Sequence, residues 1–323
     1  MSSTLDTWLR HVNRQIPRGL VAFERRCGQT LWSGWRSAEF PETAATLVLL
    51  HGTGGARHSW RPVLERLDPA VGVLIPDLPG HGATRCEGHS RHGLDDMAAE
   101  LLELLRAEGL GRIDCLAGHS AGAAVALALA LRERTGLRIG SLLGIAPSLV
   151  PPPALYTMML GPLLAPLVGS DLSVTATAAL ARSTGLVDRL LASTGSTIDA
   201  DQREAYRLLF GDSGHVRGAI HFMAATDLPG LLERLPRLPT QSLATGFMVA
   251  DDDPWIPAAI YRARAWSDKG PALAMPAAGG HVGFHGAGSK IAWHDRAIVR
   301  FFCRSLGRSW CEADHGSGAV TRR

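Results

Sequence analysis

Apolar and polar positions alternate along the chain in a way that predicts strands and helices in turn. Short, continuous apolar runs bounded by turn residues indicate buried strands, and apolar residues spaced three and four apart indicate amphipathic helices. Buried strands are expected at 46–50, 71–76, 113–117, 141–145, 242–250 and 272–276, short antiparallel edge strands at 21–23 and 31–35, and helices at 58–67, 94–108, 121–134 and 293–306. Such strand–helix repeats pack helices on both faces of one mostly parallel central sheet, so the fold class is α/β.

The pattern changes after the strand at 141–145. Residues 147–238 are helical in character, punctuated by proline and glycine, and contain no convincing strand. This predicts a helical lid, or cap, inserted between two strands of the sheet. The expected organisation is a core at 1–146 and 241–311, a lid at 147–240 and a flexible tail at 312–323.

Composition favours a compact enzyme over a fibre or a nucleic-acid-binding protein. The 323 residues are 46% hydrophobic, enough for a large core, and the net charge is only +3. Arginines provide nearly all the positive charge, and they are scattered among carboxylates instead of forming a basic block. We therefore expect no nucleic-acid partner.

The cysteines and the N-terminal segment favour a cytoplasmic protein. The five cysteines form no C-x-x-C pair, and their odd number argues against a disulfide framework, so a reducing compartment is the simplest assignment. The first 14 residues carry charges within their apolar run and no small-residue cleavage site, so we do not expect them to be a signal peptide.

The longest apolar tract, 154–169, contains Pro162 and Pro166 and is shorter than the roughly 20 residues of a spanning helix. We expect it to line a lipophilic pocket. Docking on a membrane surface and ordinary helix packing remain the alternatives.

A candidate nucleophile lies where the strand at 113–117 meets an alanine-rich helix. The sequence Gly118-His-Ser-Ala-Gly122 matches the G-x-S-x-G elbow, in which a strained turn exposes the serine above the sheet. Residues two before and two after that serine pack almost atom on atom, so both must be small. Ser120 is therefore the expected nucleophile.

An acid and a base follow in the chain order that this elbow requires. The strand at 242–250 leads into Asp251-Asp-Asp-Pro-Trp-Ile-Pro257, and the strand at 272–276 leads into Ala277-Ala-Gly-Gly-His281. We expect Asp253 to be the acid, because the prolines that follow fix its loop, with Asp251 and Asp252 as competitors. His281 is then the base, taking the Ser120 proton while the acid holds the imidazole tautomer.

The glycine-rich loop after the first buried strand can present backbone N–H groups to an oxyanion. Thr53 and Ala121 are the expected pair. His51 and Asp77, at two strand ends, are interpreted as structural residues that organise their loops.

Together these motifs resemble the α/β-hydrolase superfamily over almost the whole chain. The residues that carry the resemblance are His51-Gly-Thr-Gly, Asp77-Leu-Pro-Gly-His-Gly, Gly118-His-Ser-Ala-Gly, Asp253-Pro-Trp-Ile-Pro and Gly280-His281. The resemblance implies an α/β-hydrolase fold carrying a serine-type triad of Ser120, Asp253 and His281.

Within the superfamily, the chain is most similar to the magnesium-chelatase accessory proteins of bacteriochlorophyll synthesis. The similar segments are Ser120-Ala-Gly-Ala-Ala124, Ser193-Thr-Gly-Ser196, Tyr206-Arg-Leu-Leu-Phe210, Met223-Ala-Ala-Thr-Asp-Leu-Pro-Gly-Leu-Leu232 and Leu235-Pro-Arg-Leu-Pro239. This resemblance implies a role supporting magnesium insertion into protoporphyrin IX, with chelatase subunits as candidate partners and peripheral contact with the inner or photosynthetic membrane. Two alternatives stay open: a general serine esterase for a lipophilic ester, and a non-catalytic protein that binds porphyrin or assists the chelatase.

The expected ligand is a small lipophilic substrate or a tetrapyrrole. Methionine and aromatic side chains offer adaptable apolar contact. The residues expected to contact the ligand are His119, Tyr156, Met158, Met159, Met223 and Phe284.

Neither a cofactor nor a protein-bound metal is expected. His81, Cys86, His89 and His92 crowd one loop without a recognised ligand spacing, and imidazole and thiolate are poor ligands for magnesium.

Overall fold

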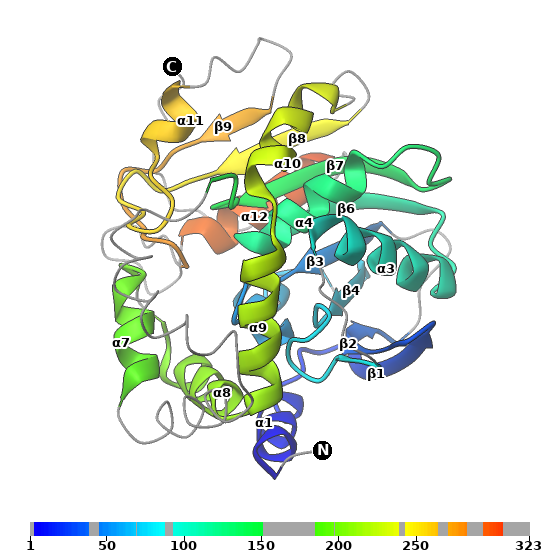
Figure 1. The fold of residues 1–323 in the computed structure, drawn as a ribbon, viewed down its shortest axis with the longest axis vertical. Helices are drawn as coiled ribbons and strands as arrows, with labels where there is room; N and C mark the ends of the chain where they lie inside the picture. The colour runs from blue at the N-terminus through cyan, green and yellow to red at the C-terminus, as the bar shows by residue number, and fades with distance from the viewer. Residues whose placement is uncertain are drawn as a thin grey trace.

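A computed structural model describes residues 3–38, 45–68, 70–87, 93–150, 185–196, 198–238, 243–263, 271–282 and 293–305. Over these ranges the chain forms a nine-stranded sheet in the order β1-β2-β4-β3-β6-β7-β8-β9, with β5 paired to β2 (Figure 1). The strands from β4 to β9 along this path are parallel, whereas β2 pairs antiparallel with β1, β4 and β5. The expected α/β-hydrolase fold, with its mostly parallel central sheet, is confirmed.

The strand and helix bounds are as follows. The strands are β1 (Leu20–Cys27), β2 (Thr30–Ser37), β3 (Thr46–Leu50), β4 (Gly72–Pro76), β5 (Arg85–Cys86), β6 (Arg112–His119), β7 (Arg138–Ile145), β8 (Ala244–Met248) and β9 (Ala272–Ala274). The core helices are α1 (Ser3–Asn13), η1 (Arg57–Trp60), α2 (Arg61–Leu64), α3 (Leu94–Ala107), α4 (Ala121–Ala130), α11 (Ala259–Ala263) and α12 (Trp293–Ser305). Between β7 and β8 lie α7 (Leu186–Ser193), α8 (Ala200–Phe210), α9 (Ser213–Ala225), α10 (Leu228–Arg234) and η2 (Leu235–Arg237), which we call the inserted helices.

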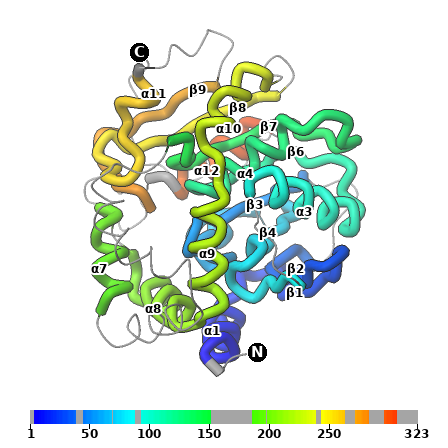
Figure 2. Tube along the Cα trace, in the orientation of Figure 1, coloured from blue at the N-terminus to red at the C-terminus, as the bar shows by residue number. Residues whose placement is uncertain are grey.

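The sheet has a hydrophobic core on each face, because successive side chains of a strand point to opposite sides. In β3, Val48 and Leu50 join the core beneath α3 and α4, while Leu47 and Leu49 join the core that includes α1 and α12. This alternation explains why the buried strands are apolar at nearly every position, as expected for a sheet covered on both faces. In Figure 2, α1 at the blue end of the chain lies beside α8, although the two helices are far apart in sequence.

A buried ion pair fixes the loop after β4. Asp77 and Arg57 are both fully buried, and the guanidinium contacts the carboxylate at 2.6 Å. The same carboxylate accepts N–H groups from Arg57 and Ala83, at 2.8 and 2.9 Å. Burial opposes ionisation of Asp77, but the charge and hydrogen bonds of Arg57 outweigh it, so the pKa of Asp77 lies below its usual value. Asp77 therefore organises its loop, as expected.

Helix α9 crosses this loop at backbone contact. A Cβ atom on Gly218 would lie 1.9 Å from the carbonyl oxygen of Gly80, closer than any real contact. The two glycines therefore let α9 approach the core directly, and Met223 of α9 lines the same cavity as Ser120. The boundaries of the lid, 147–240, remain a prediction, since residues 151–184 lie outside the described residues.

Several elements differ from the sequence expectation. The helix expected at 58–67 is a 3-10 turn followed by the short helix α2, because Pro62 lacks an N–H group and can only begin an α-helix. The helix after the elbow ends at Ala130 instead of residue 134, where the apolar run gives way to charged residues and Arg134 adopts a positive φ. Strands β1 and β2 are longer than expected, at eight residues each.

Two further observations concern the cysteines and membrane association. Cys27, Cys86 and Cys115 carry free thiols. In the parts of the chain that the structure describes, no helix combines the length and apolarity needed to cross a membrane.

Four fully or almost fully buried histidines surround the loops after β3 and β4. They are His51, His58, His81 and His215. The pKa values of His51 and His215 are lowered, chiefly by burial, and burial lowers the pKa of His58 to about 3. His58 packs against Trp8 and Tyr206, with ring centroids 6.0 and 4.7 Å away. Folding therefore disfavours the charged form of His51, His58 and His215.

We predict that acid destabilises the protein partly through His58. In the unfolded chain the His58 side chain binds a proton near pH 6.5, but in the folded protein it does not until about pH 3. The contribution of buried, neutral His58 to stability is therefore complete above pH 6.5 and is lost as the pH falls below it. Between pH 7 and pH 5, the free energy of unfolding of His58→Phe should fall by about 2 kcal/mol less than that of the wild type. Urea titrations at both pH values measure this difference. The exposed His221→Gln variant is the control, and a pH dependence of His58→Phe equal to that of the wild type would contradict the prediction.

Candidate active site

The turn between β6 and α4 holds Ser120 in a strained conformation. Its φ is 52°, in the left-handed region that non-glycine residues rarely adopt. A Cβ atom on Gly118 would lie 2.4 Å from the backbone of Gly122, and one on Gly122 would lie 2.4 Å from the carbonyl oxygen of His51. Both glycines are thus required by contact, and the elbow expected from the sequence is present.

The turn is also tied to the end of β7. The N–H group of Ser120 donates to the carbonyl oxygen of Ile145 at 2.8 Å, and the N–H group of Ser148 donates to the carbonyl oxygen of Ser120 at 3.1 Å. These bonds fix the backbone on both sides of the serine, so its hydroxyl points in a defined direction.

A chain of hydrogen bonds runs from Ser120 through His281 to Asp253. His281 Nε2 lies 3.0 Å from Ser120 Oγ, and His281 Nδ1 lies 2.9 Å from Asp253 Oδ2. His281 and Asp253 are buried, at 3% and 6% exposure. Since Nδ1–H donates to the carboxylate, Nε2 is left to accept the serine hydroxyl proton. The structure thus brings together three residues that are far apart in the sequence.

The three consecutive aspartates make different contacts. Asp253 Oδ1 accepts the N–H groups of Trp255 and Ile256, at 2.8 and 2.9 Å, while Oδ2 faces His281. Asp252 Oδ1 accepts the N–H groups of Gly279 and Gly280, and exposed Asp251 pairs with Arg262. Of the three, Asp253 is the one placed against the imidazole.

Two rings flank the imidazole of His281. Trp255 stacks on it, with ring centroids 5.3 Å apart and planes 25° apart. On another side, His119 lies 5.0 Å away, and its Nε2–H donates to the carbonyl oxygen of His281 at 2.9 Å. The imidazole is therefore restrained by contacts as well as by its two hydrogen bonds.

Sequence reasoning did not single out Trp255 or Ser148. The hydroxyl of Ser148 lies 3.1 Å from Ser120 Oγ. Its position after the strand β7, at the same sheet edge as the elbow, was the signal available in the sequence. Trp255, two residues after Asp253, offered a similar signal.

An apolar cavity of about 460 Å³ opens onto Ser120 and His281. Thr53 and Ala121, the expected oxyanion donors, both line it, as do His119 and Met223. Ala121 is the first residue of α4, so its N–H group has no partner within the helix. Tyr156, Met158, Met159 and Phe284, also expected to contact a ligand, lie outside the described residues.

The inserted helices and their connecting turns form one side of the cavity wall, which carries no fixed charge among the described residues. Its contributors from 185–238 are Leu190, Leu191, Thr194, Tyr206, Phe210, Met223, Thr226, Leu228 and Pro229. Burial raises the pKa of Tyr206 to about 12, so this side chain stays neutral. The wall thus suits an uncharged, apolar group.

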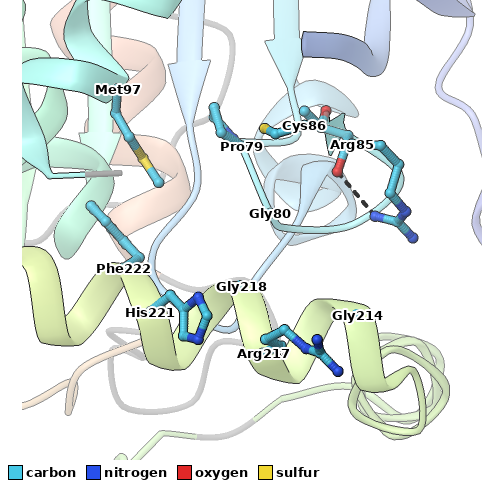
Figure 3. Close-up of a pocket in the computed structure, with 11 residues that line it drawn as sticks. Pro79, Gly80, Arg85, Cys86, Met97, Gly214, Arg217, Gly218, His221 and Phe222 are labelled. Carbon is cyan, nitrogen blue, oxygen red and sulfur yellow. Dashed lines mark hydrogen bonds between the residues drawn. The ribbon is translucent and has the colours of Figure 1, made fainter. Parts of the chain in front are cut away.

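A second, smaller hollow of about 180 Å³ lies between α9 and the loop after β4 (Figure 3). Arg85 and Arg217 border it, over an apolar floor that includes Met97 and Phe222. The Arg85 guanidinium is already used to hold its own loop, because Nη1 donates to the carbonyl oxygens of Gly82 and Thr84 at 2.9 and 3.0 Å. None of the three hydrogen-bonded residues of the elbow site lines this hollow.

Metal-binding side chains do not converge in the described ranges: no group of three or more histidine, cysteine, aspartate or glutamate residues there could hold an ion. His81 packs between His51 and His215, with centroids 5.3 and 5.4 Å away. His89 and His92 lie outside the described residues.

The chain is similar in sequence to a magnesium-chelatase subunit and to hydrolases. It is 34% identical to the magnesium-chelatase 30 kDa subunit of Rhodobacter capsulatus over 228 residues, which cover 69% of this chain and 76% of that protein. It is also 37% identical to the 2-hydroxy-6-oxo-2,4-heptadienoate hydrolase of Pseudomonas putida over 89 residues, but these cover only 27% of this chain and 32% of that enzyme.

The fold has close structural counterparts as well. Carboxylesterase CesB from Bacillus subtilis superimposes with a TM-score of 0.66 at 15% identity, covering 95% of this chain and 99% of that one. A sequence model of the alpha/beta hydrolase family matches residues 47–297, which include the elbow, the acid loop and the histidine loop. The chain therefore belongs to the alpha/beta hydrolase family.

Proposed function

We propose that this protein is a serine hydrolase that cleaves an uncharged carboxylic ester with an apolar acyl group. The hydrogen-bond chain from Ser120 through His281 to Asp253, at the wall of an apolar cavity, is the observation that carries the proposal. A serine hydroxyl is a weak nucleophile at neutral pH, and a neighbouring imidazole held in the correct tautomer is what activates it.

In the proposed reaction, Ser120 Oγ attacks the ester carbonyl carbon while its proton passes to His281 Nε2. The imidazolium that forms is stabilised by Asp253 and then protonates the leaving alcohol, so that an acyl-serine remains. A water molecule, deprotonated by His281, releases the acid and returns the hydroxyl of Ser120. Trp255 and Ile256 donate to the other oxygen of Asp253 and hold the carboxylate in place beside the imidazole.

The negative charge that develops on the ester oxygen needs donors already in place. We assign this task to the backbone N–H groups of Thr53 and Ala121, which line the cavity beside Ser120. The N–H group of Ser120 is not available, since it donates to Ile145.

The lining of the cavity supports this substrate class. Its described lining is apolar apart from hydroxyls and the two histidines, and it contains no lysine, arginine, aspartate or glutamate. A carboxylate buried there would lose its hydration without gaining a cationic partner, which costs several kcal/mol in an apolar site. The acyl group of the substrate is therefore expected to be neutral.

We predict that a fluorophosphonate probe forms a covalent adduct on Ser120. Intact-protein mass and peptide mapping measure the adduct and its position. Ser120→Ala should not react, and wild-type protein unfolded in urea, in which the three side chains are separated, should not react either. An adduct elsewhere on the chain, or equal labelling of folded and unfolded protein, would contradict the proposal.

We predict that ester hydrolysis discriminates against charge in the acyl group. The p-nitrophenyl esters of valerate and of glutarate offer a matched pair, with a methyl and a carboxylate at the same end of the acyl chain. The kcat/KM for the charged ester should be lower by a factor on the order of 100. Comparable kcat/KM values for the two esters would show that the acyl group does not bind in this apolar cavity.

A second candidate function is favoured by the relative from Rhodobacter capsulatus, which is named as a magnesium-chelatase subunit and is aligned over 76% of its length. Under this hypothesis the protein supports magnesium insertion into protoporphyrin IX, with a tetrapyrrole as ligand and chelatase subunits as partners. The apolar cavity is compatible with part of a macrocycle, but its described lining offers no cation for the propionates.

Complementation of a bacteriochlorophyll-producing strain that lacks its own copy of the related gene tests this second function. If hydrolysis serves pigment synthesis, the wild type restores bacteriochlorophyll and Ser120→Ala does not, as measured by pigment absorbance at equal protein levels. Full restoration by Ser120→Ala would favour the non-catalytic hypothesis, in which the protein binds porphyrin or assists the chelatase. Failure of the wild type to restore pigment would leave a general esterase.

A further inference from the structure

The turn Ser193–Ser196, which begins at the last residue of α7, contacts the loop that carries His281. The N–H group of His281 donates to the carbonyl oxygen of Thr194 at 2.7 Å. Ser196 Oγ accepts the N–H group of Val282 at 2.9 Å and donates to the carbonyl oxygen of Gly279 at 3.1 Å. The turn thus bonds the histidine loop both before and after the imidazole-bearing residue.

The same turn also holds the ring that stacks on the imidazole. Trp255 Nε1–H donates to the carbonyl oxygen of Ser193 at 3.1 Å. Trp255 in turn stacks on His281, 5.3 Å away. One four-residue segment is therefore bonded to the histidine and to its aromatic neighbour.

Steric fit at Gly280 makes this contact specific. Gly280 has a φ of +61°, and a Cβ atom there would lie 2.3 Å from the carbonyl oxygen of Thr194 and 2.7 Å from Ser196 Oγ. The turn and the histidine loop therefore meet backbone to backbone, which is possible only because residue 280 has no side chain.

The histidine loop has little regular structure of its own to hold it. Strand β9 ends at Ala274, and His281 lies seven positions further along the chain. Bonds from the core also hold it: Asp252 accepts the N–H groups of Gly279 and Gly280, His119 donates to the carbonyl oxygen of His281, and the Asp251 N–H group donates to the carbonyl oxygen of Pro276. The turn Ser193–Ser196 is the support that comes from the inserted helices.

We propose that the turn Ser193–Ser196 positions the base His281, chiefly through the hydroxyl of Ser196, so that the placement of α7 sets the alignment of the base. This inference rests on the proposed serine hydrolase function. Helix α7 also supplies Leu190 and Leu191 to the cavity wall. The helix that borders the substrate is thereby linked to the residue that activates the nucleophile.

Loss of the Ser196 hydroxyl should lower turnover without changing substrate binding. Ser196 does not line the cavity, so its loss should not change contacts with the substrate. It should instead let the imidazole drift from Ser120 Oγ, and misplacement of a reacting group by an ångström can lower a rate by up to a hundredfold. The expected signature is a lower kcat with an unchanged KM.

The test compares Ser196→Ala with Ser193→Ala. Ser193 is a matched control, because its hydroxyl donates to the carbonyl oxygen of Leu190 within α7 and makes no described bond to the histidine loop. Hydrogen exchange of the Val282 amide reports the bond to Ser196 Oγ directly and requires no turnover. Steady-state hydrolysis of p-nitrophenyl valerate and its pH profile report the alignment of the base.

We predict that Ser196→Ala speeds exchange of the Val282 amide by about tenfold or more and lowers kcat by about tenfold with KM unchanged. Its pH profile should shift, whereas Ser193→Ala and the hydroxyl-preserving Ser196→Thr should match the wild type in exchange, kcat and pH profile.

Val282 exchange in Ser196→Ala equal to that in Ser193→Ala would overturn the inference, and so would faster exchange with an unchanged kcat. If the wild type itself hydrolyses no ester and takes up no fluorophosphonate, the proposed function fails, and so does the catalytic part of this inference. In that case the Val282 exchange rates still decide whether Ser196 holds the histidine loop.

Discussion

The close approach of β6 to α4 at the elbow is the constraint on which the site depends. Gly118 and Gly122 leave no room for a Cβ atom, and Ser120 is held at a positive φ between them. Such a strained backbone conformation persists only where the surrounding structure holds it in place. Here the surroundings are the parallel strands β3 and β7 on either side of β6, and the bond from the Ser120 N–H group to Ile145.

Parallel topology then brings the other two side chains to the same place. The carboxyl ends of neighbouring parallel strands lie at one edge of the sheet, so the loops after β8 and β9 meet above the elbow. Within the acid loop, three adjacent carboxylates avoid mutual repulsion by taking different partners, with Arg262 for Asp251, glycine N–H groups for Asp252 and the imidazole for Asp253.

The elbow, the acid loop and the histidine loop could be predicted because each is encoded locally, as glycine spacing or as polar residues directly after an apolar strand. The short helix α2 and the buried ion pair of Arg57 with Asp77 could not, since their conformation depends on contacts with distant segments. The same holds for the turn at residues 193–196, whose role exists only once α7 has packed beside the histidine loop. Polar residues in loops carry no local signal of a partner 80 or 160 residues away.

The central claim is that Ser120 and His281 act as one unit, and non-additivity of their substitutions tests it most directly. The measurement is kcat/KM for p-nitrophenyl valerate in Ser120→Ala, His281→Ala and the double variant, each shown to be folded by its melting curve. If the residues work together, each single substitution lowers kcat/KM by a factor on the order of 10³ to 10⁶ and the double variant is no worse. Modest single losses that multiply in the double variant would mean that the two side chains act independently, and the proposed mechanism would be wrong.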